Sequence, residues 1–249
     1  SFSEAVAVVG SRRCTNYGKA VAVELAGKLA EHGVPTISGM AKGIDSYAQT
    51  ACLQNDGYTI AFVASGVDIC YPKEHRALYE QICERGAVIS EYPPGARPIP
   101  QRFVERNRLI SAWATKVVIV EAGKKSGALS TATYAGEQGK DVYAVPNRID
   151  IVEGKGTNRL ISEGATPYLD FSSLGLALNK RLMNADTIET AADKWEQEVV
   201  ERLVEGPMSV LQLANELKCS DEELREKLFT LELEGKLTVR GDAVTINRL

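Results

Sequence analysis

Short apolar runs alternate with amphipathic segments along the first 170 residues of this 249-residue chain. The runs hold three to five residues and are often β-branched, which is typical of strands buried on both faces. This alternation predicts βαβ units, and therefore an α/β fold with a doubly wound, mostly parallel sheet. The expected strands are residues 6–9, 35–38, 59–63, 87–91, 117–121, 142–145 and 166–168.

The first two connections that follow a strand are predicted to contain helices. Residues 17–32 carry apolar side chains at helical spacing and stop before Gly33, a residue type that commonly follows a helix end. Residues 44–55 form the second expected helix.

The strand pattern stops near residue 180, and the remaining sequence predicts a second, smaller domain. Three expected helices, 195–205, 210–217 and 221–234, precede strands 236–239 and 243–246, an order typical of a winged helix. We therefore expect a large domain over 1–179, a linker over 180–194 and a C-terminal winged-helix domain over 195–249.

The formal net charge of −4 is distributed unevenly. Residues 1–180 hold 20 basic and 18 acidic side chains, whereas residues 181–249 hold 9 and 15. Within 97–125 seven basic residues meet two acidic ones, which predicts a local anion-binding surface. The third expected tail helix, 221–234, carries six acids and two bases and would repel phosphates. We therefore expect the winged helix to contact protein, its own partner domain, or nothing essential.

The chain has no run of 18 apolar residues and no basic start followed by an apolar stretch, which predicts neither a membrane span nor a secretory signal. Its five cysteines lack CxxC spacing, so reduced thiols in the cytoplasm are expected rather than disulfides or zinc. We expect no metal, no cofactor and no membrane partner.

Glycine and serine concentrate where the expected strands end. Because ligands of open α/β sheets bind outside the carboxyl ends of the strands, these turns predict the functional edge of the sheet. After the first strand, Gly10 and Ser11 let an anion approach the backbone closely, and Arg12 can donate two hydrogen bonds to a phosphate. The alternative is a turn with solvated arginines.

Two further turns have similar chemistry. Gly39 and Lys42 follow the second strand and are expected to cradle phosphate, whereas Asp45 is expected only to cap the next helix. Ser126 and Gly127 follow the fifth strand and could bond phosphate or pack closely; their spacing does not fit a Walker A motif, so ATP hydrolysis is not predicted.

A basic cluster with one aromatic residue precedes the fifth strand. It consists of Arg102, Phe103, Arg106, Asn107 and Arg108. Cations beside a ring that can stack on a base are the components of a single-strand binding groove. The alternatives are a solvated charged face and a core position for Phe103.

Catalytic motifs are scarce. The only histidines, His32 and His75, have no neighbouring nucleophile signal and are expected at the surface, and Asp68 is expected to form a turn. No GxSxG, HExxH or paired-carboxylate motif occurs, so we expect a protein that is not an enzyme.

Taken together, five motifs in this order resemble the DNA-processing protein A (DprA/Smf) family over about residues 5–170. They are Gly10-Ser11-Arg12, residues 38–45, residues 106–110, residues 126–132 and Gly156-Thr157-Asn158 with the residues up to 165. The resemblance implies an extended Rossmann-like domain that binds single-stranded DNA, forms a homodimer and loads the RecA recombinase during natural transformation.

The resemblance also implies residue roles. Arg12 would hold phosphate, Gly39 and Lys42 would line the pocket, Arg106 and Asn107 would anchor the DNA backbone, and Phe103 would stack on a base. Three positions depart from the family pattern: Val104-Glu105 after Phe103, Pro100 where lysine is common, and Asn147 where glycine is usual. The rival hypothesis is a nucleotide-binding enzyme or sensor of the phosphoribohydrolase type; this chain lacks the Pro-Gly-Gly-x-Gly-Thr run of those enzymes.

Overall fold

A computed structural model describes residues 4–176, 199, 202–203, 206–217, 219–221, 224–225, 228 and 237–246. The chain divides into two compact units, Ser1–Leu182 and Met183–Leu249. The expected domain limits at 179/180 and 194/195 lie outside the described residues and stay predictions.

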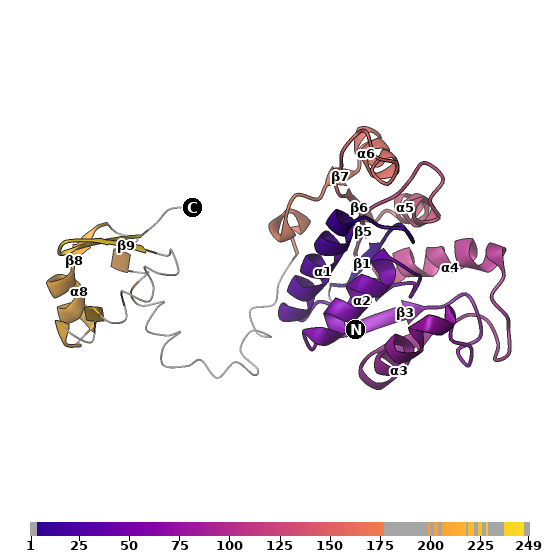
Figure 1. The fold of residues 1–249 in the computed structure, drawn as a ribbon, viewed down its shortest axis with the longest axis horizontal. Helices are drawn as coiled ribbons and strands as arrows, with labels where there is room; N and C mark the ends of the chain where they lie inside the picture. Colours follow the sequence, from indigo (N-terminus) through magenta and orange to yellow (C-terminus); the bar gives the residue numbers. More distant parts are fainter. Residues whose placement is uncertain are drawn as a thin grey trace. The chain divides into compact units, whose positions relative to one another are not determined.

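The large unit is built on a seven-stranded sheet in which every adjacent pair of strands is parallel (Figure 1). The strand order is β4-β3-β2-β1-β5-β6-β7. The strands are β1 (Val6–Val9), β2 (Thr36–Ser38), β3 (Thr59–Phe62), β4 (Ala87–Ile89), β5 (Lys116–Ile119), β6 (Asp141–Ala144) and β7 (Thr166–Pro167). Each lies within one or two residues of an expected strand, which confirms the doubly wound α/β fold.

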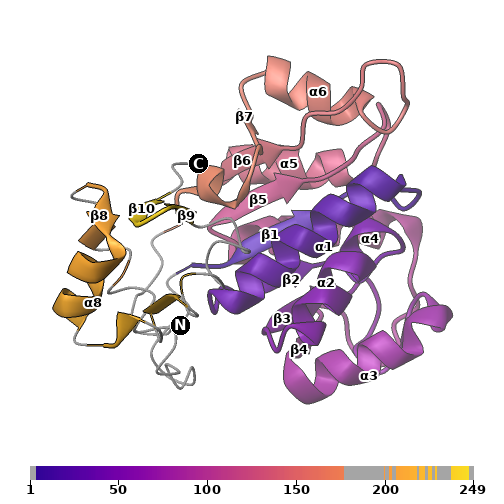
Figure 2. The same ribbon diagram turned by 60° about the vertical axis from the view of Figure 1, so that its left-hand side comes forward.

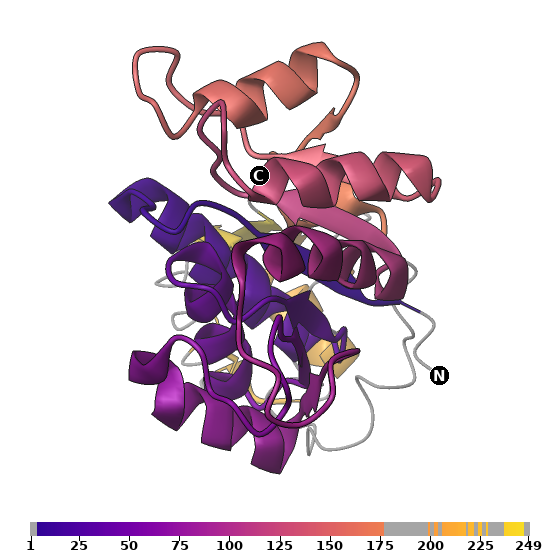
Figure 3. The same ribbon diagram turned by 90° about the vertical axis from the view of Figure 1, so that its right-hand side faces the viewer.

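Helices cover both faces of this sheet. They are α1 (Asn16–Glu31), α2 (Ile44–Gln54), α3 (Arg76–Arg85), α4 (Pro100–Trp113), α5 (Ala128–Glu137) and α6 (Lys155–Ser162), with 3₁₀ turns η1 (Lys73–His75) and η2 (Phe171–Leu174). Figure 2 shows α1 and α2 side by side on one face, and Figure 3 turns the other face, with α4 and α5, toward the viewer.

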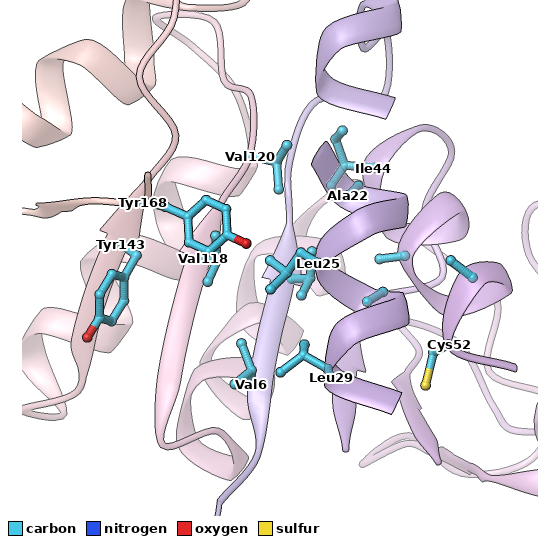
Figure 4. Packing of buried hydrophobic residues seen from close by; sticks show 14 of the residues in the cluster. Val6, Ala22, Leu25, Leu29, Ile44, Cys52, Val118, Val120, Tyr143 and Tyr168 are labelled. Carbon is cyan, nitrogen blue, oxygen red and sulfur yellow. The ribbon is translucent and has the colours of Figure 1, made fainter. Parts of the chain in front are cut away.

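The two-sided burial explains why the strands are apolar without alternation. In β1, Val6 and Val8 pack against α1 and α2, whereas Ala7 and Val9 pack against α4 and α5. Figure 4 shows Leu25 and Leu29 of α1 lying against the first of these faces. Burying a leucine side chain fully contributes about 1.5–3 kcal/mol to stability.

The direction of winding reverses between β1 and β5. Connections on one side of this boundary place β2, β3 and β4 outward from β1, and those on the other side place β6 and β7 outward from β5. The connections that follow β1 and β5 therefore run in opposite directions, and open α/β sheets bind their ligands at such a reversal.

The small unit contains α8 (Val210–Leu217), at the expected position, and a three-stranded antiparallel sheet in the order β8-β10-β9. Its strands are β8 (Met208–Ser209), β9 (Leu237–Arg240) and β10 (Ala243–Ile246). The helices expected over 195–205 and 221–234 lie largely outside the described residues. Arg225 forms ion pairs with Asp221 and Asp242, at 2.9 and 3.2 Å. The expectation that this unit avoids DNA stays a prediction.

None of the helices in the described ranges is both long enough and apolar enough to cross a bilayer.

Two helical glycines give a matched test of packing. A Cβ atom at Gly18 in α1 would overlap the buried carboxylate of Glu121, whereas a Cβ at Gly136 in α5 would meet no atom within 4 Å. We expect Gly18→Ala to lower the free energy of unfolding by about 1–3 kcal/mol through overpacking. Gly136→Ala should raise it by about 0.5–1 kcal/mol because alanine favours the helix.

Urea unfolding followed by tryptophan fluorescence would measure both changes. Trp113 packs against Phe62, with ring centroids 5.4 Å apart, and reports on the large unit when the measurements are made in a Trp195→Phe background. Equal effects of the two alanines would contradict the packing seen at Gly18.

Candidate functional site

An open groove of about 970 Å³ lies at the carboxyl ends of β1 and β5. Its walls are the loops after these strands, the first turns of α4, Tyr71 from the loop that follows β3, and Val152-Glu153. The exposed cations that line it are Arg12, Arg13, Lys124 and Lys125. The groove therefore occupies the winding reversal of the sheet, as expected for this fold.

Glu121, directly beyond β5, fixes the loops around this groove. Its carboxylate is fully buried and accepts hydrogen bonds from Thr15 N (2.8 Å), Thr15 Oγ1 (2.6 Å) and Asn147 Nδ2 (3.1 Å). Its backbone oxygen accepts from Ser11 N at 2.7 Å. These donors compensate the buried charge and tie together the loops that follow β1, β5 and β6.

The loops after β1 and β2 are in direct contact. Ile44 N donates to Ser11 O at 3.2 Å, and Gly43 has a φ of 80°, where a Cβ would collide with Ser11 O. Only glycine suits this position, because it combines a left-handed backbone with close approach to a neighbouring carbonyl.

Arg106 lies beneath the groove and only 3% of it is exposed. Its Nη1 donates to Gly39 O (2.9 Å) and to Phe62 O, and its Nε donates to Asn107 Oδ1 (3.2 Å). Burial lowers the pKa of Arg106 to about 10. The guanidinium thus binds the carboxyl ends of β2 and β3. Arg106 also lines the groove and the recess, and its expected contact with a DNA backbone stays a prediction.

Asp45 complements this arginine. Its Oδ2 accepts from Gly39 N at 3.1 Å, and burial raises the pKa of Asp45 while the Arg106 charge opposes that rise. The N-cap of α2 is Gly43, so the expectation that Asp45 only caps the helix is wrong. A Cβ on Gly39 would collide with both Arg106 and Asp45, so glycine is required for this packing.

Asn107 has a similar internal role. It is 9% exposed, and its Nδ2 donates to Gly127 O (3.2 Å) and Ser130 Oγ (2.9 Å). The amide joins α4 to the start of α5. Asn107 also lines the groove, and its expected contact with a DNA backbone stays a prediction.

Arg102 and Arg108 point away from the groove, contrary to expectation. Arg102 lies 4.6 Å from the Tyr92 ring and donates to Arg97 O at 2.7 Å, while Arg108 pairs with Glu91. Neither lines the groove. The reason is the helical period of α4: positions 103, 106 and 107 share one face, and positions 102 and 108 lie outside it.

Phe103 occupies the groove wall rather than the core. The Arg12 guanidinium carbon lies 5.2 Å from its ring centroid, and the Tyr71 ring lies 5.5 Å from it. Phe103 is half-buried, and it lines both the groove and a small adjoining recess of about 50 Å³. The structure thus joins an exposed cation to an accessible aromatic ring.

The remaining predicted residues divide between groove and recess. Gly10, Ser11, Ser126 and Gly127 line the groove. Gly39 and Lys42 line the recess, where the Gly39 N–H and carbonyl are already bonded to Asp45 and Arg106, and Lys42 pairs with Glu74. A free Gly39 N–H for phosphate, expected from the turn, is therefore not offered.

The predicted site residues left out several groove-lining residues, of which the exposed Arg13, Lys124 and Lys125 and the aromatic Tyr71 bear most on ligand binding. The two lysines lie between the end of β5 and Ser126, so the carboxyl-end rule that selected Ser126 and Gly127 could also have selected them. Tyr71 follows β3 and is brought in by the sheet order, which the sequence does not show.

The residues considered for catalysis have structural partners. The Asp68 carboxylate accepts from Gly95 N at 2.9 Å, in agreement with a turn role. His32 packs on Phe171 at 4.7 Å, and His75 Nδ1 lies 3.1 Å from Met40 O. Both histidines are partly exposed. Within the described residues no group of three His, Cys, Asp or Glu side chains could hold a metal ion.

Comparison with known sequences identifies similar proteins. Residues 2–178 match the profile of the family described as DNA recombination-mediator protein A. A putative DNA processing protein DprA from Mycobacterium tuberculosis is 47% identical over 161 residues, 65% of this chain and 41% of that protein. The DNA processing protein DprA of Streptococcus pneumoniae is 43% identical over 160 residues, 64% and 56% of the two chains. The chain thus spans about half the length of these curated relatives.

Solved structures agree with this similarity. DNA processing protein A from Streptococcus pneumoniae superposes with a TM-score of 0.65 at 37% identity, covering 71% of this chain and 62% of that one. A Helicobacter pylori DNA processing protein A, solved to study its single-stranded DNA binding mode, gives 0.64 at 34% identity, covering 69% and 78%. A molybdenum cofactor binding protein from Rippkaea orientalis shares only the fold, with a TM-score of 0.51 at 15% identity and coverage of 70% and 94%.

The buried arginine should be essential for stability. Arg106→Met removes the donor from three internal oxygens and the countercharge from Asp45, so we expect a loss of about 3–5 kcal/mol in the free energy of unfolding. Arg108→Met, two residues along the same helix, removes only a surface ion pair and should lose about 0–1 kcal/mol.

The same fluorescence-detected urea titration compares the two variants. A loss for Arg106→Met no greater than that for Arg108→Met would mean that the internal hydrogen bonds of Arg106 do not hold the fold.

Proposed function

This chain belongs to the DNA recombination-mediator protein A family, and on that premise we propose that its groove binds single-stranded DNA. The observation that carries the proposal is the pairing of Arg12 with the accessible ring of Phe103 at the winding reversal of the sheet. Single-strand sites combine a cation that contacts phosphate with an aromatic ring that stacks on a base, because unpaired bases expose their faces.

The charge of the groove supports the same ligand. Arg12, Arg13, Lys124 and Lys125 are exposed there, and none forms an ion pair within the described part of the chain. Of the acids that line the groove, Asp45 is buried beside Arg106 and Glu153 is partly buried. When such cations neutralise phosphates, the counterions condensed on the nucleic acid are released, and this release drives association.

The residues have distinct proposed roles. Arg12 contacts phosphate and Phe103 stacks on a base, while Gly10, Ser11, Ser126 and Gly127 shape the wall against which the backbone lies. Arg106 and Asn107 act as positioning residues, because they fix the helix face that carries Phe103.

The wider biology is proposed on the strength of family membership. We propose that the protein acts without catalysis in the cytoplasm, as a homodimer that protects incoming single-stranded DNA and hands it to RecA in natural transformation. The Helicobacter pylori relative, studied for its single-stranded DNA binding mode, supports the binding of single-stranded DNA alone. The five cysteines are unpaired, as a reducing compartment requires.

The nucleotide-enzyme alternative has less support. The chain lacks the Pro-Gly-Gly-x-Gly-Thr run of the phosphoribohydrolases and carries residues 121–127 (EAGKKSG) in its place. Titration with labelled poly-dT at increasing salt and assay of free base released from nucleoside monophosphates separate the two functions.

Arg12 and Arg102 give a matched pair for the phosphate role. Arg12→Ala should weaken binding of a labelled dT oligonucleotide and lower the slope of log K against log salt by about 0.7, the value for one contact with a single strand. Arg102→Ala removes the same charge outside the groove and should leave the slope unchanged. Fluorescence anisotropy over a salt series measures both, and equal slopes for wild type and Arg12→Ala would refute the assigned contact.

Phe103 provides a test of stacking that does not depend on salt. Phe103→Ala should lose about 1–3 kcal/mol of binding free energy with little change in the salt slope, because no charge is removed. Phe103→Tyr keeps an aromatic face and should retain most of the affinity. If the alanine variant folds and binds like wild type, Phe103 does not contact DNA.

A further inference from the structure

We propose that Lys124 and Lys125 form a second phosphate-binding position in the groove, separate from the Arg12–Phe103 pair. The proposal deepens the proposed function and rests on it: a bound single strand would contact the protein through at least two of its phosphates.

The two positions lie on different parts of the groove wall. Arg12 and Phe103 also line the small recess, together with Lys42 and Tyr71, whereas Lys124 and Lys125 line the groove alone. Arg12 lies at the recess, where its guanidinium carbon is 5.2 Å from the Phe103 ring centroid and that ring is 5.5 Å from the Tyr71 ring. The lysines follow β5 and do not line the recess. We therefore place the second phosphate at the part of the groove wall formed by the lysines with Val152 and Glu153.

Both lysines are available for a ligand. They are exposed, and neither has an ion-pair partner in the part of the chain that the structure describes. The contrast with Lys42 is informative, because Lys42 lies near the same edge and is paired with Glu74. Adjacent unpaired lysines repel each other, and an anion between them relieves that repulsion.

The loop that carries these lysines is anchored before any ligand binds. Ala122 N donates to Glu153 O at 2.8 Å, Gly156 N donates to Ala122 O at 2.7 Å, and Ser126 N donates to Gly123 O at 3.0 Å. A charge held on a fixed loop loses less conformational freedom on binding than one on a mobile loop.

An apolar surface accompanies the second position. Val152 lines the groove, is 62% exposed and lies in van der Waals range of a Cβ built on Gly123. A base next to the second phosphate can cover this side chain. The second position therefore repeats the composition of the first, with an apolar surface beside a cation.

The double variant Lys124→Gln/Lys125→Gln tests the proposal by salt dependence. With a labelled dT 12-mer, its slope of log K against log salt should be lower than that of wild type by about 1.4, the value for two lost contacts with a single strand. The conservative variant Lys124→Arg/Lys125→Arg should keep the wild-type slope.

Lys155→Gln is the matched control. Lys155 is exposed at the start of α6, 30 residues beyond Lys125 in the sequence, and does not line the groove. Its loss should leave the slope unchanged if direct contacts set the slope. If Lys155→Gln lowers the slope by as much per removed charge as the double variant does, the slope reports the total charge of the protein rather than direct contacts. That result would overturn the second position.

The outcomes also distinguish failure of the second phosphate position from failure of the proposed function, the binding of single-stranded DNA. If wild type fails to bind the 12-mer, the proposed function itself is wrong. If wild type binds and Arg12→Ala lowers the slope but the double glutamine variant does not, the function stands and the second position is overturned.

Discussion

The guanidinium of Arg106 holds together the carboxyl ends of two strands and the helix that crosses them. It donates to Gly39 O beyond β2 and to Phe62 O at the end of β3, and the carboxylate of Asp45 offsets its charge. Because Phe103 lies one turn earlier on the same face of α4, the buried arginine also sets the position of the exposed ring. A buried residue thus fixes the position of the aromatic ring that we propose stacks on a base.

The sequence predicted the sheet well and the site in part, for physical reasons that differ. Strands buried on both faces leave a strong apolar signal, so all seven were found. The burial of Arg106 was not predicted, because its partners Gly39 O and Phe62 O lie 67 and 44 residues away in the sequence, a separation over which the sequence gives no indication of burial. Arg102 and Arg108 were misassigned for a simpler reason: the helical period of α4 was not applied to the cluster.

Local charge matters more here than the total. A net charge of −4 would by itself argue against a polyanionic ligand, yet four unpaired cations line one groove. Other basic residues of the large unit, including Arg108 and Arg148, are neutralised by neighbouring acids. Screening over about 10 Å in ordinary salt limits the influence of distant acids on the groove.

Glu121 has a consequence for the thermodynamics of recognition. Its hydrogen bonds fix the loops after β1, β5 and β6 in advance, so the protein gives up little conformational entropy when a ligand enters. The conformational entropy lost on binding then comes mainly from the single-stranded DNA. Purine-rich strands, whose bases stack on one another, must first be unstacked, so a groove without base-edge contacts would still discriminate by the stiffness of its ligand.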